Sequence, residues 1–177
     1  MRRFLDSLYL GAGVLAAAFL VGIGILMLTQ IIARELGYQV RGADDLTAWF
    51  CAASAFLPLA HTFKRGELVR VGVLLERLRP AARRYAELWS LGIATVFVGY
   101  MAVSVTRFVH QSWEINDIAQ GMLPLPLWIP QSSFAVGVII FFIAIVDELV
   151  LVIGRHTPTY VLAEEERLAS GDFADTL

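Results

Sequence analysis

Histidine and cysteine, which can act as nucleophiles, proton carriers or metal ligands, are few and scattered along this sequence. There are three histidines, His61, His110 and His156, and a single cysteine, Cys51. They show neither the spacing of a zinc site nor that of a nucleophile and its base, and one cysteine cannot form an internal disulfide. Cys51 lies in an apolar run, where a thiolate is disfavoured. We therefore predict no catalytic, cofactor or metal site and no enzymatic activity.

Charged residues at the borders of apolar runs need an account, because a charge at the bilayer centre costs about 2.5–3.5 kcal/mol on insertion scales. Asp44 and Asp45 precede the second run, where each can cap a helix or pair with a basic residue on the same side. Arg107 is close enough to an interface for its side chain to reach it. Asp147 and Glu148 lie near the end of the fourth run, and we expect them to pair with arginines that follow the second run.

The elements that must position these residues are four long apolar runs. The chain has 177 residues, 58% hydrophobic and 17% charged, and its mean hydropathy is +0.67. A membrane-spanning helix needs about 20 mostly apolar residues. We predict spans over residues 7–33, 46–63, 88–107 and 131–153. Since a bilayer leaves helices as the way for a short multi-span chain to satisfy its backbone, the predicted fold is an all-α integral membrane protein, a single membrane domain over residues 1–177.

Basic residues are distributed unevenly between the two sides of these spans. One side carries Arg34, Arg41 and Arg107, and the other carries all the remaining basic residues: Arg2, Arg3, Lys64, Arg65, Arg70, Arg77, Arg79, Arg83, Arg84, Arg155 and Arg167. An excess of Lys and Arg marks the cytoplasmic side, so we expect both termini to be cytoplasmic. The formal net charge of −2 argues against a nucleic-acid partner.

A basic connector, residues 64–84, joins the second and third spans. Its apolar residues share one helical face: Leu68, Val71, Leu74, Leu75 and Leu78. Arginines on another face would meet anionic headgroups, so we expect a moderately amphipathic helix in the cytoplasmic interface; the alternative is a plain basic loop. After the fourth span, the acidic tail over residues 157–177 has no apolar face and is predicted to be a frayed helix or disordered.

The middle of each span is apolar, whereas an ion-coupled carrier normally places ionisable or unwound elements near the midplane. Small residues do recur in the first two spans, where they let helices approach closely: Gly13, Ala17, Ala18 and Gly22, and then Ala48, Ala52 and Ala55. Packing surface without a site of its own is typical of a subunit of a larger complex.

Three stretches resemble the small permease subunit (DctQ family) of tripartite ATP-independent periplasmic (TRAP) transporters. Ala43-Asp-Asp-Leu-Thr-Ala-Trp49 is similar to the family's acidic entry into the second span. Phe63-Lys-Arg-Gly-Glu-Leu-Val-Arg-Val71 is similar to its basic, glycine-containing turn, and Leu125-Pro-Leu-Trp-Ile-Pro130, followed by Gly137, to its entry into the fourth span. The family often has His where this chain has Leu68 and Asp where it has Gly72, so polar contacts made there by relatives are not carried over.

The resemblance implies a non-catalytic subunit of a sodium-coupled transporter in the bacterial inner membrane. Its partners would be membrane lipids, a large permease subunit (DctM type) that carries the substrate and sodium sites, and a periplasmic binding protein (DctP type) that delivers an organic acid. This chain would anchor and enlarge the scaffold of the large subunit. The residues of interest are candidate assembly residues: Asp45, Trp49, Lys64, Arg65, Gly66, Arg70 and Trp128.

Other functions are open on the sequence alone. A stand-alone small carrier or channel would need polar residues near the midplane and would transport by itself. A generic membrane assembly factor would form no stable complex with a large permease. A membrane-embedded enzyme that uses Cys51 would lose its function when that residue is changed to alanine.

Overall fold

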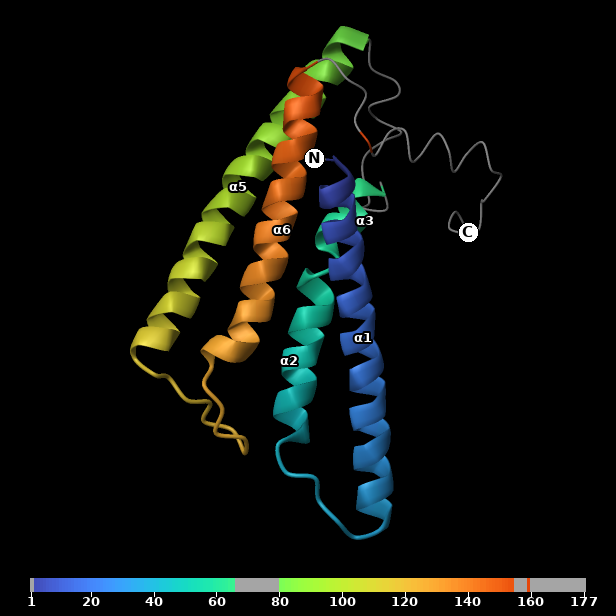
Figure 1. Ribbon diagram of the computed structural model, residues 1–177, viewed down its shortest axis with the longest axis vertical. Coiled ribbons are helices and arrows are strands. Elements are labelled where there is room, and N and C mark those ends of the chain that lie inside the picture. Colours follow the sequence, from blue (N-terminus) through green and yellow to red (C-terminus); the bar gives the residue numbers. More distant parts are fainter. Residues whose placement is uncertain (1, 66–79, 155–158, 160–177) are drawn as a thin grey trace, which may run out of the picture.

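The computed structural model describes residues 2–65, 80–154 and 159, which form helices joined by loops (Figure 1). The helices are α1 (Arg2–Glu35), α2 (Ala43–Phe56), α3 (Leu59–Lys64), α5 (Pro80–Glu114) and α6 (Trp128–Ile153). Four segments are long and apolar enough to cross a membrane: Leu5–Glu35, Ala43–Lys64, Tyr85–Glu114 and Trp128–Ile153. The predicted all-α fold with four spans is confirmed. The predicted interfacial helix lies mostly outside the described residues, as does the acidic tail apart from Thr159.

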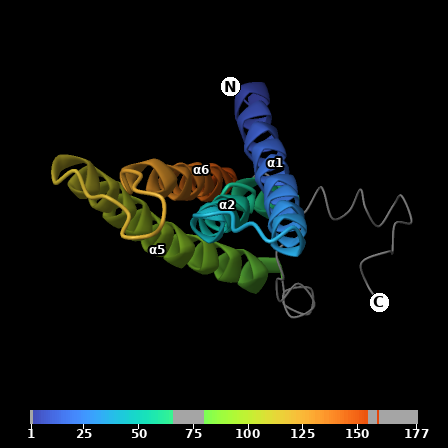
Figure 2. The same cartoon turned by 90° about the horizontal axis from the view of Figure 1, so that it is seen from below.

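The helices are arranged with α6 and the pair α2–α3 in the middle, and with α1 and α5 on either side. Helix α1 packs along α2 and α3, α6 packs against both α2 and α3, and α5 packs along α6 (Figures 1 and 2). We call the end that holds Leu5, Lys64 and Ile153 the terminal end. The opposite end, with the loops over residues 36–42 and 115–127, is the loop end (Figure 1).

The second span is broken between α2 and α3. Pro58 has no backbone N–H and so cannot donate a hydrogen bond to the carbonyl four residues earlier, which interrupts the helix. Helix α6 crosses at this break with Gly137: a Cβ there would lie 2.7 Å from the carbonyl carbon of Phe56. Nearby, the rings of Phe56 and Phe134 meet edge to face with centroids 4.2 Å apart. The break is therefore held by direct contact between the backbones of two helices.

The core lies mostly toward the terminal end, where α1, α3, α5 and α6 meet. Its buried residues are Tyr9, Ala12, Ala60, Phe63, Leu91, Ile140, Ala144, Ile145 and Val152, and a smaller cluster contains Ala16, Ala53 and Leu57. Two of the small residues lie at helix contacts as expected: Gly13 faces His61 of α3, and Gly22 faces Phe50 of α2. However, Ala17, Ala18, Ala48 and Ala55 are exposed. The helices are apolar on nearly every face, so the sequence did not define which alanines would be buried.

Both loops at the loop end depend on local backbone geometry. Gly42, the N-cap of α2, has φ +75°, and a Cβ there would lie 2.2 Å from the Leu123 side chain, so the position requires glycine. The 115–127 loop folds back on itself through hydrogen bonds from Ala119 N to Leu125 O (2.9 Å) and from Leu127 N to Asp117 O (2.9 Å). Helix α6 already begins at Trp128. The expected fourth span began at residue 131, whereas α6 also includes Pro130, because a proline is tolerated in the first turn of a helix.

We predict that Gly137→Val lowers the melting temperature, because the added side chain would force α6 away from the Phe56 backbone. Overpacking of this kind costs about 1–3 kcal/mol. The measurement is thermal unfolding of the detergent-purified protein. Gly24→Val is the matched control, since a Cβ at Gly24, within α1, meets nothing within 4 Å. Equal melting temperatures for the two variants would contradict the close crossing.

Candidate functional site

An ionic cluster at the terminal end joins three helices. Lys64, the last residue of α3, donates a hydrogen bond from Nζ to Asp147 Oδ2 on α6, and its Nζ lies 2.9 Å from Glu148 Oε1. The side chain of Lys64 is 14% exposed, that of Asp147 is 27% exposed, and that of Glu148 is fully buried. One ammonium group thus serves two neighbouring carboxylates at the packed end of the bundle.

Two further groups complete what we call the Lys64 cluster, which consists of Tyr9, Lys64, Asp147, Glu148 and Thr159. The Tyr9 ring on α1 lies 5.5 Å from Lys64 Nζ, within the range of a cation–π contact. Thr159 donates from its backbone N to Glu148 Oε2 (3.1 Å) and accepts from Lys64 Nζ at Oγ1 (3.4 Å). The cluster therefore connects α1, α3, α6 and a residue beyond α6. Breaking such a buried pair from one side leaves an uncompensated charge and costs about 3–5 kcal/mol.

Among the described residues, the partner of Asp147 and Glu148 is Lys64. The sequence favoured arginines of the connector, most of which lie outside the described residues. Among the other candidates nearby, Arg65 is exposed, and Gly66 and Arg70 lie outside the described residues. The positions of these residues in the sequence could have indicated the pair, because Lys64 ends the second span and the two acids lie near the same end of the fourth span.

A second polar contact ties the loop end together. Asp45, in the first turn of α2, accepts hydrogen bonds at Oδ2 from the backbone N–H groups of Met122 (2.9 Å) and Leu123 (3.4 Å). A Cβ at Gly121 would lie 2.3 Å from the same oxygen, so the loop approaches the carboxylate where it has no side chain. The first turn of α2 therefore holds the 115–127 loop in place.

Asp44 makes a different contact, accepting a hydrogen bond at Oδ1 from Gln30 Nε2 on α1 (2.9 Å). Neither aspartate caps α2, whose N-cap is Gly42 without a side-chain hydrogen bond, so the cap expected at Asp44 is wrong. Of the two interpretations of Asp45, the structure supports neither a cap nor an ion pair with a described arginine: its recorded partners are backbone N–H groups. No short-range pattern identifies a partner 77 residues away.

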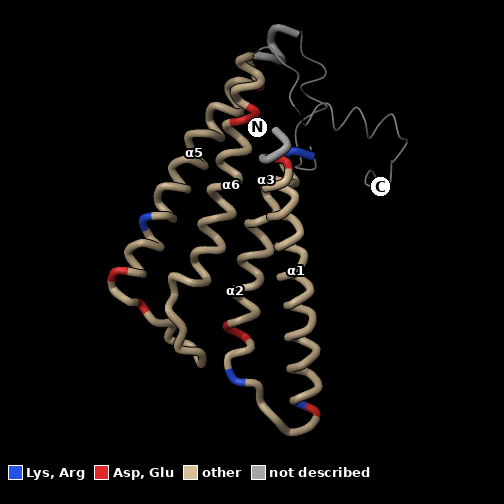
Figure 3. The backbone as a smooth tube through the Cα atoms, in the orientation of Figure 1, with Lys and Arg blue, Asp and Glu red and all other residues tan. Residues whose placement is uncertain are grey.

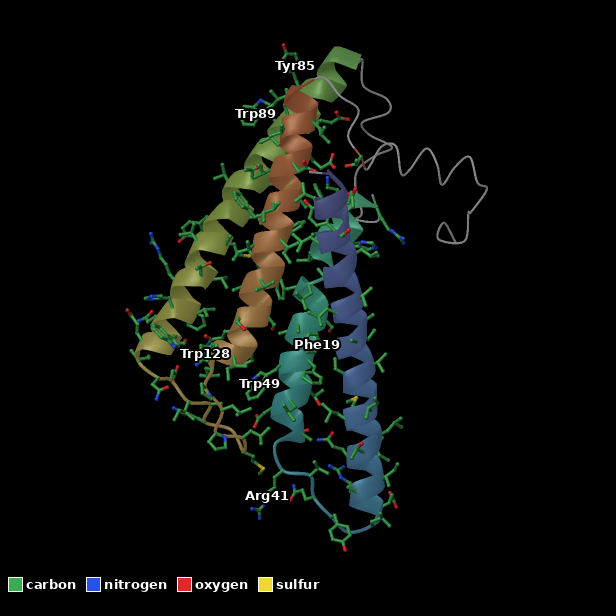
Figure 4. All side chains as sticks on the ribbon, viewed as in Figure 1. Phe19, Arg41, Trp49, Tyr85, Trp89 and Trp128 are labelled. Carbon is green, nitrogen blue, oxygen red and sulfur yellow. The ribbon has the colours of Figure 1, made fainter. Side chains whose placement is uncertain are left out.

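The two candidate tryptophans lie toward the loop end. Trp49 is on α2 and Trp128 is the first residue of α6; both are half-buried (Figure 4). Indole rings favour the headgroup level of a bilayer, where one part of the ring can be apolar and the other can contact water. Their place is consistent with a depth marker for the loop end, separate from the Asp45 contact.

We predict that Lys64→Met strongly destabilises the protein, because it leaves two carboxylates without their cation. The loss should be about 3–5 kcal/mol, measured by thermal or denaturant unfolding in detergent. Arg41→Met is the control, since that side chain is exposed at the loop end. The triple variant Lys64→Met, Asp147→Leu, Glu148→Leu should recover most of the loss, since a buried ion pair can often be replaced by apolar residues. Equal stability of Lys64→Met and Arg41→Met would refute the stabilising role of the Lys64 cluster.

We predict that Asp45→Ala loosens the 115–127 loop without unfolding the bundle. Hydrogen bonds to a charged group contribute about 1.5–3 kcal/mol, so amide exchange at Met122 and Leu123 should accelerate about tenfold or more. Hydrogen exchange followed by mass spectrometry on peptides covering this loop measures the effect. Asp44→Ala is the control because its recorded partner is Gln30. Equal exchange in the wild type and in Asp45→Ala would show that the contact does not hold the loop.

Comparison with known proteins identifies the family. No curated protein matches the chain. The family model described as "Tripartite ATP-independent periplasmic transporters, DctQ component" matches residues 23–155, which is more than half of the sequence. The match includes Asp45, Lys64, Asp147 and Glu148, and it confirms the resemblance seen in the three motifs. The chain therefore belongs to the DctQ family and is a multi-pass small membrane subunit of a tripartite ATP-independent periplasmic transporter.

Proposed function

We propose that this chain anchors and enlarges the static scaffold of a large permease subunit (DctM type) and does not itself move the solute. The transporter is a sodium-coupled system of the bacterial inner membrane that takes up an organic acid delivered by a periplasmic binding protein (DctP type). Sodium coupling, solute class and these two partners follow from the family resemblance. The scaffold role is supported by the arrangement of polar groups in this chain.

The observation that carries the proposal is that the buried and half-buried charged groups at the terminal end of the spans are paired with one another. Lys64, Asp147 and Glu148 form one cluster near the terminal end. A carrier needs such groups to be available to its ion or substrate near the midplane. Here the groups join helices instead, which favours a structural role over a transport path.

Ties at both ends support a rigid frame. The Lys64 cluster holds α1, α3 and α6 together, and Asp45 holds α2 to the loop that leads into α6. Figure 3 shows long uncharged stretches on every helix that crosses the bundle, with charged residues gathered toward the two ends. A frame of fixed shape and fixed depth is what a moving transport domain needs beside it.

The orientation is part of the proposal. Most basic residues fall at the terminal end, which we place in the cytoplasm, and the loop end then faces the periplasm. Exposed aromatic side chains occur at the loop end, where Tyr38 and Trp113 lie. Such rings prefer the headgroup level and would fix the depth of the subunit.

We predict that this chain forms a stable complex with the large subunit and transports nothing alone. Proteoliposomes containing this chain, the large subunit, or both are compared for uptake of a labelled organic acid, with binding protein outside and an inward sodium gradient. Uptake is expected only where both subunits are present, and the two should co-purify from membranes.

Two results would contradict the proposal in different ways. Sodium-driven uptake by this chain alone would make it a carrier in its own right. Full uptake by the large subunit alone, together with failure to co-purify, would favour an assembly factor. The Lys64→Met and Arg41→Met pair serves as a control, since the first should lower the yield of the complex and the second should not.

A further inference from the structure

One face of α5 is exposed along the length of the span and is rich in aromatic residues. Its positions recur three or four residues apart and therefore share one side of the helix. The exposed residues on this side include Tyr85, Trp89, Val96, Tyr100 and Val103. Figure 4 shows Tyr85 and Trp89 on the side of α5 that is turned away from α1. We call this surface the aromatic face of α5.

The other long exposed surface, on α1, has a different composition. Between residues 10 and 32 its exposed large side chains are Leu, Val, Ile and Met, without an aromatic residue. Aliphatic side chains need no hydrogen-bond partner and therefore suit lipid tails, whereas a surface that also carries a hydroxyl or a charge is better matched by protein. The two surfaces therefore differ in the kind of neighbour they suit.

A tyrosine hydroxyl lies at mid-depth on the aromatic face. Tyr100 is close to the midpoint of the span Tyr85–Glu114, and 75% of its surface is exposed. No hydrogen bond joins its hydroxyl to a described residue. Lipid tails have no acceptor to offer at this depth, and a polar group without a partner in hydrocarbon is unfavourable. We therefore expect the Tyr100 hydroxyl to donate a hydrogen bond to an acceptor on a neighbouring protein.

A positive charge lies on the same side of the helix, two turns further along. Arg107 is exposed, and no ion pair or hydrogen bond connects it to a described side chain. A second copy of this chain would be a poor neighbour, because a symmetric parallel pair would bring Arg107 against Arg107. The complement is a different helix, with an acceptor at the level of Tyr100 and a carboxylate or carbonyl oxygens at the level of Arg107.

The face is also hollowed near the terminal end. A groove of about 600 Å³ lies along Tyr85, Trp89, Gly92, Val96 and Phe97, and a Cβ at Gly92 would meet nothing within 4 Å. A groove of this kind can receive large side chains from a neighbouring helix, as in knobs-into-holes packing. Shape, hydrogen bonding and charge thus indicate the same side of α5.

We propose that the aromatic face of α5 is the surface on which a transmembrane helix of the large permease subunit docks. The inference rests on the proposed function, and it adds the contact surface and the chemistry expected of the partner. The helix that docks carries bulky apolar side chains opposite Gly92, an acceptor opposite Tyr100 and a negative or carbonyl-rich position opposite Arg107. The aliphatic surface of α1 faces lipid.

Photo-crosslinking in membranes that contain both subunits tests the surface. A photoreactive residue replaces Val96 or Val103 on α5, or, as matched controls, Val14 or Val21 on α1; all four valines are more than half exposed. Adducts with the large subunit are expected from the two α5 positions and not from the two α1 positions. A second measurement is the affinity of the purified subunits for each other. Tyr100→Phe should weaken it about two- to tenfold, the effect of losing one hydrogen bond, whereas Tyr38→Phe should leave it unchanged.

The outcomes separate this proposal from the one on which it rests. Adducts from α1 instead of α5, adducts with a second copy of this chain, or an intact complex with only lipid adducts at α5 would each overturn the docking surface. In all three cases the scaffold role can still hold, because the complex itself is recovered. Failure of the wild-type subunits to co-purify would overturn the proposed function.

Discussion

Hydrocarbon provides neither hydrogen bonds nor counter-ions, so polar groups inside a membrane protein depend on the protein for their partners. Lys64 is where this constraint acts most strongly. Its ammonium group neutralises two carboxylates of α6 while lying against the Tyr9 ring of α1. Because partial disruption would leave a buried charge, the three helices are stable mainly as a group. The packing at the terminal end follows from this requirement.

The break at Pro58 lets Lys64 reach its partners. Helix α3 is a separate element of 6 residues that contacts both α1 and α6, so its last residue can lie between them. Gly137 permits this arrangement because its missing side chain leaves room for the Phe56 backbone. A proline and a lysine of the second span and a glycine of the fourth thus shape the same contact between helices.

The number and type of the helices could be predicted because four apolar runs exceed the length needed to cross a bilayer. The burial of particular residues could not. Helices that are apolar all round carry no periodic pattern that marks their inner face. The sequence therefore could not indicate that Ala16 and Ala53 would be buried while Ala17 and Ala48 would be exposed. Long-range partners were equally hidden. Asp45 binds backbone N–H groups 77 and 78 residues away, and backbone groups are the same at every position.

Lys64 and Tyr100 together define the relation between this subunit and its surroundings. The chain satisfies its buried charges internally, at the terminal end, yet leaves one hydroxyl at mid-depth and one guanidinium group on the outer side of α5. If lipid surrounded this surface, replacing Tyr100 with phenylalanine would stabilise the protein, since an unpaired hydroxyl in hydrocarbon is destabilising. Its presence is therefore better explained by a neighbour than by the fold. On this argument the Lys64 cluster holds the subunit together, and the Tyr100 hydroxyl and the Arg107 guanidinium group lie where the subunit contacts its partner.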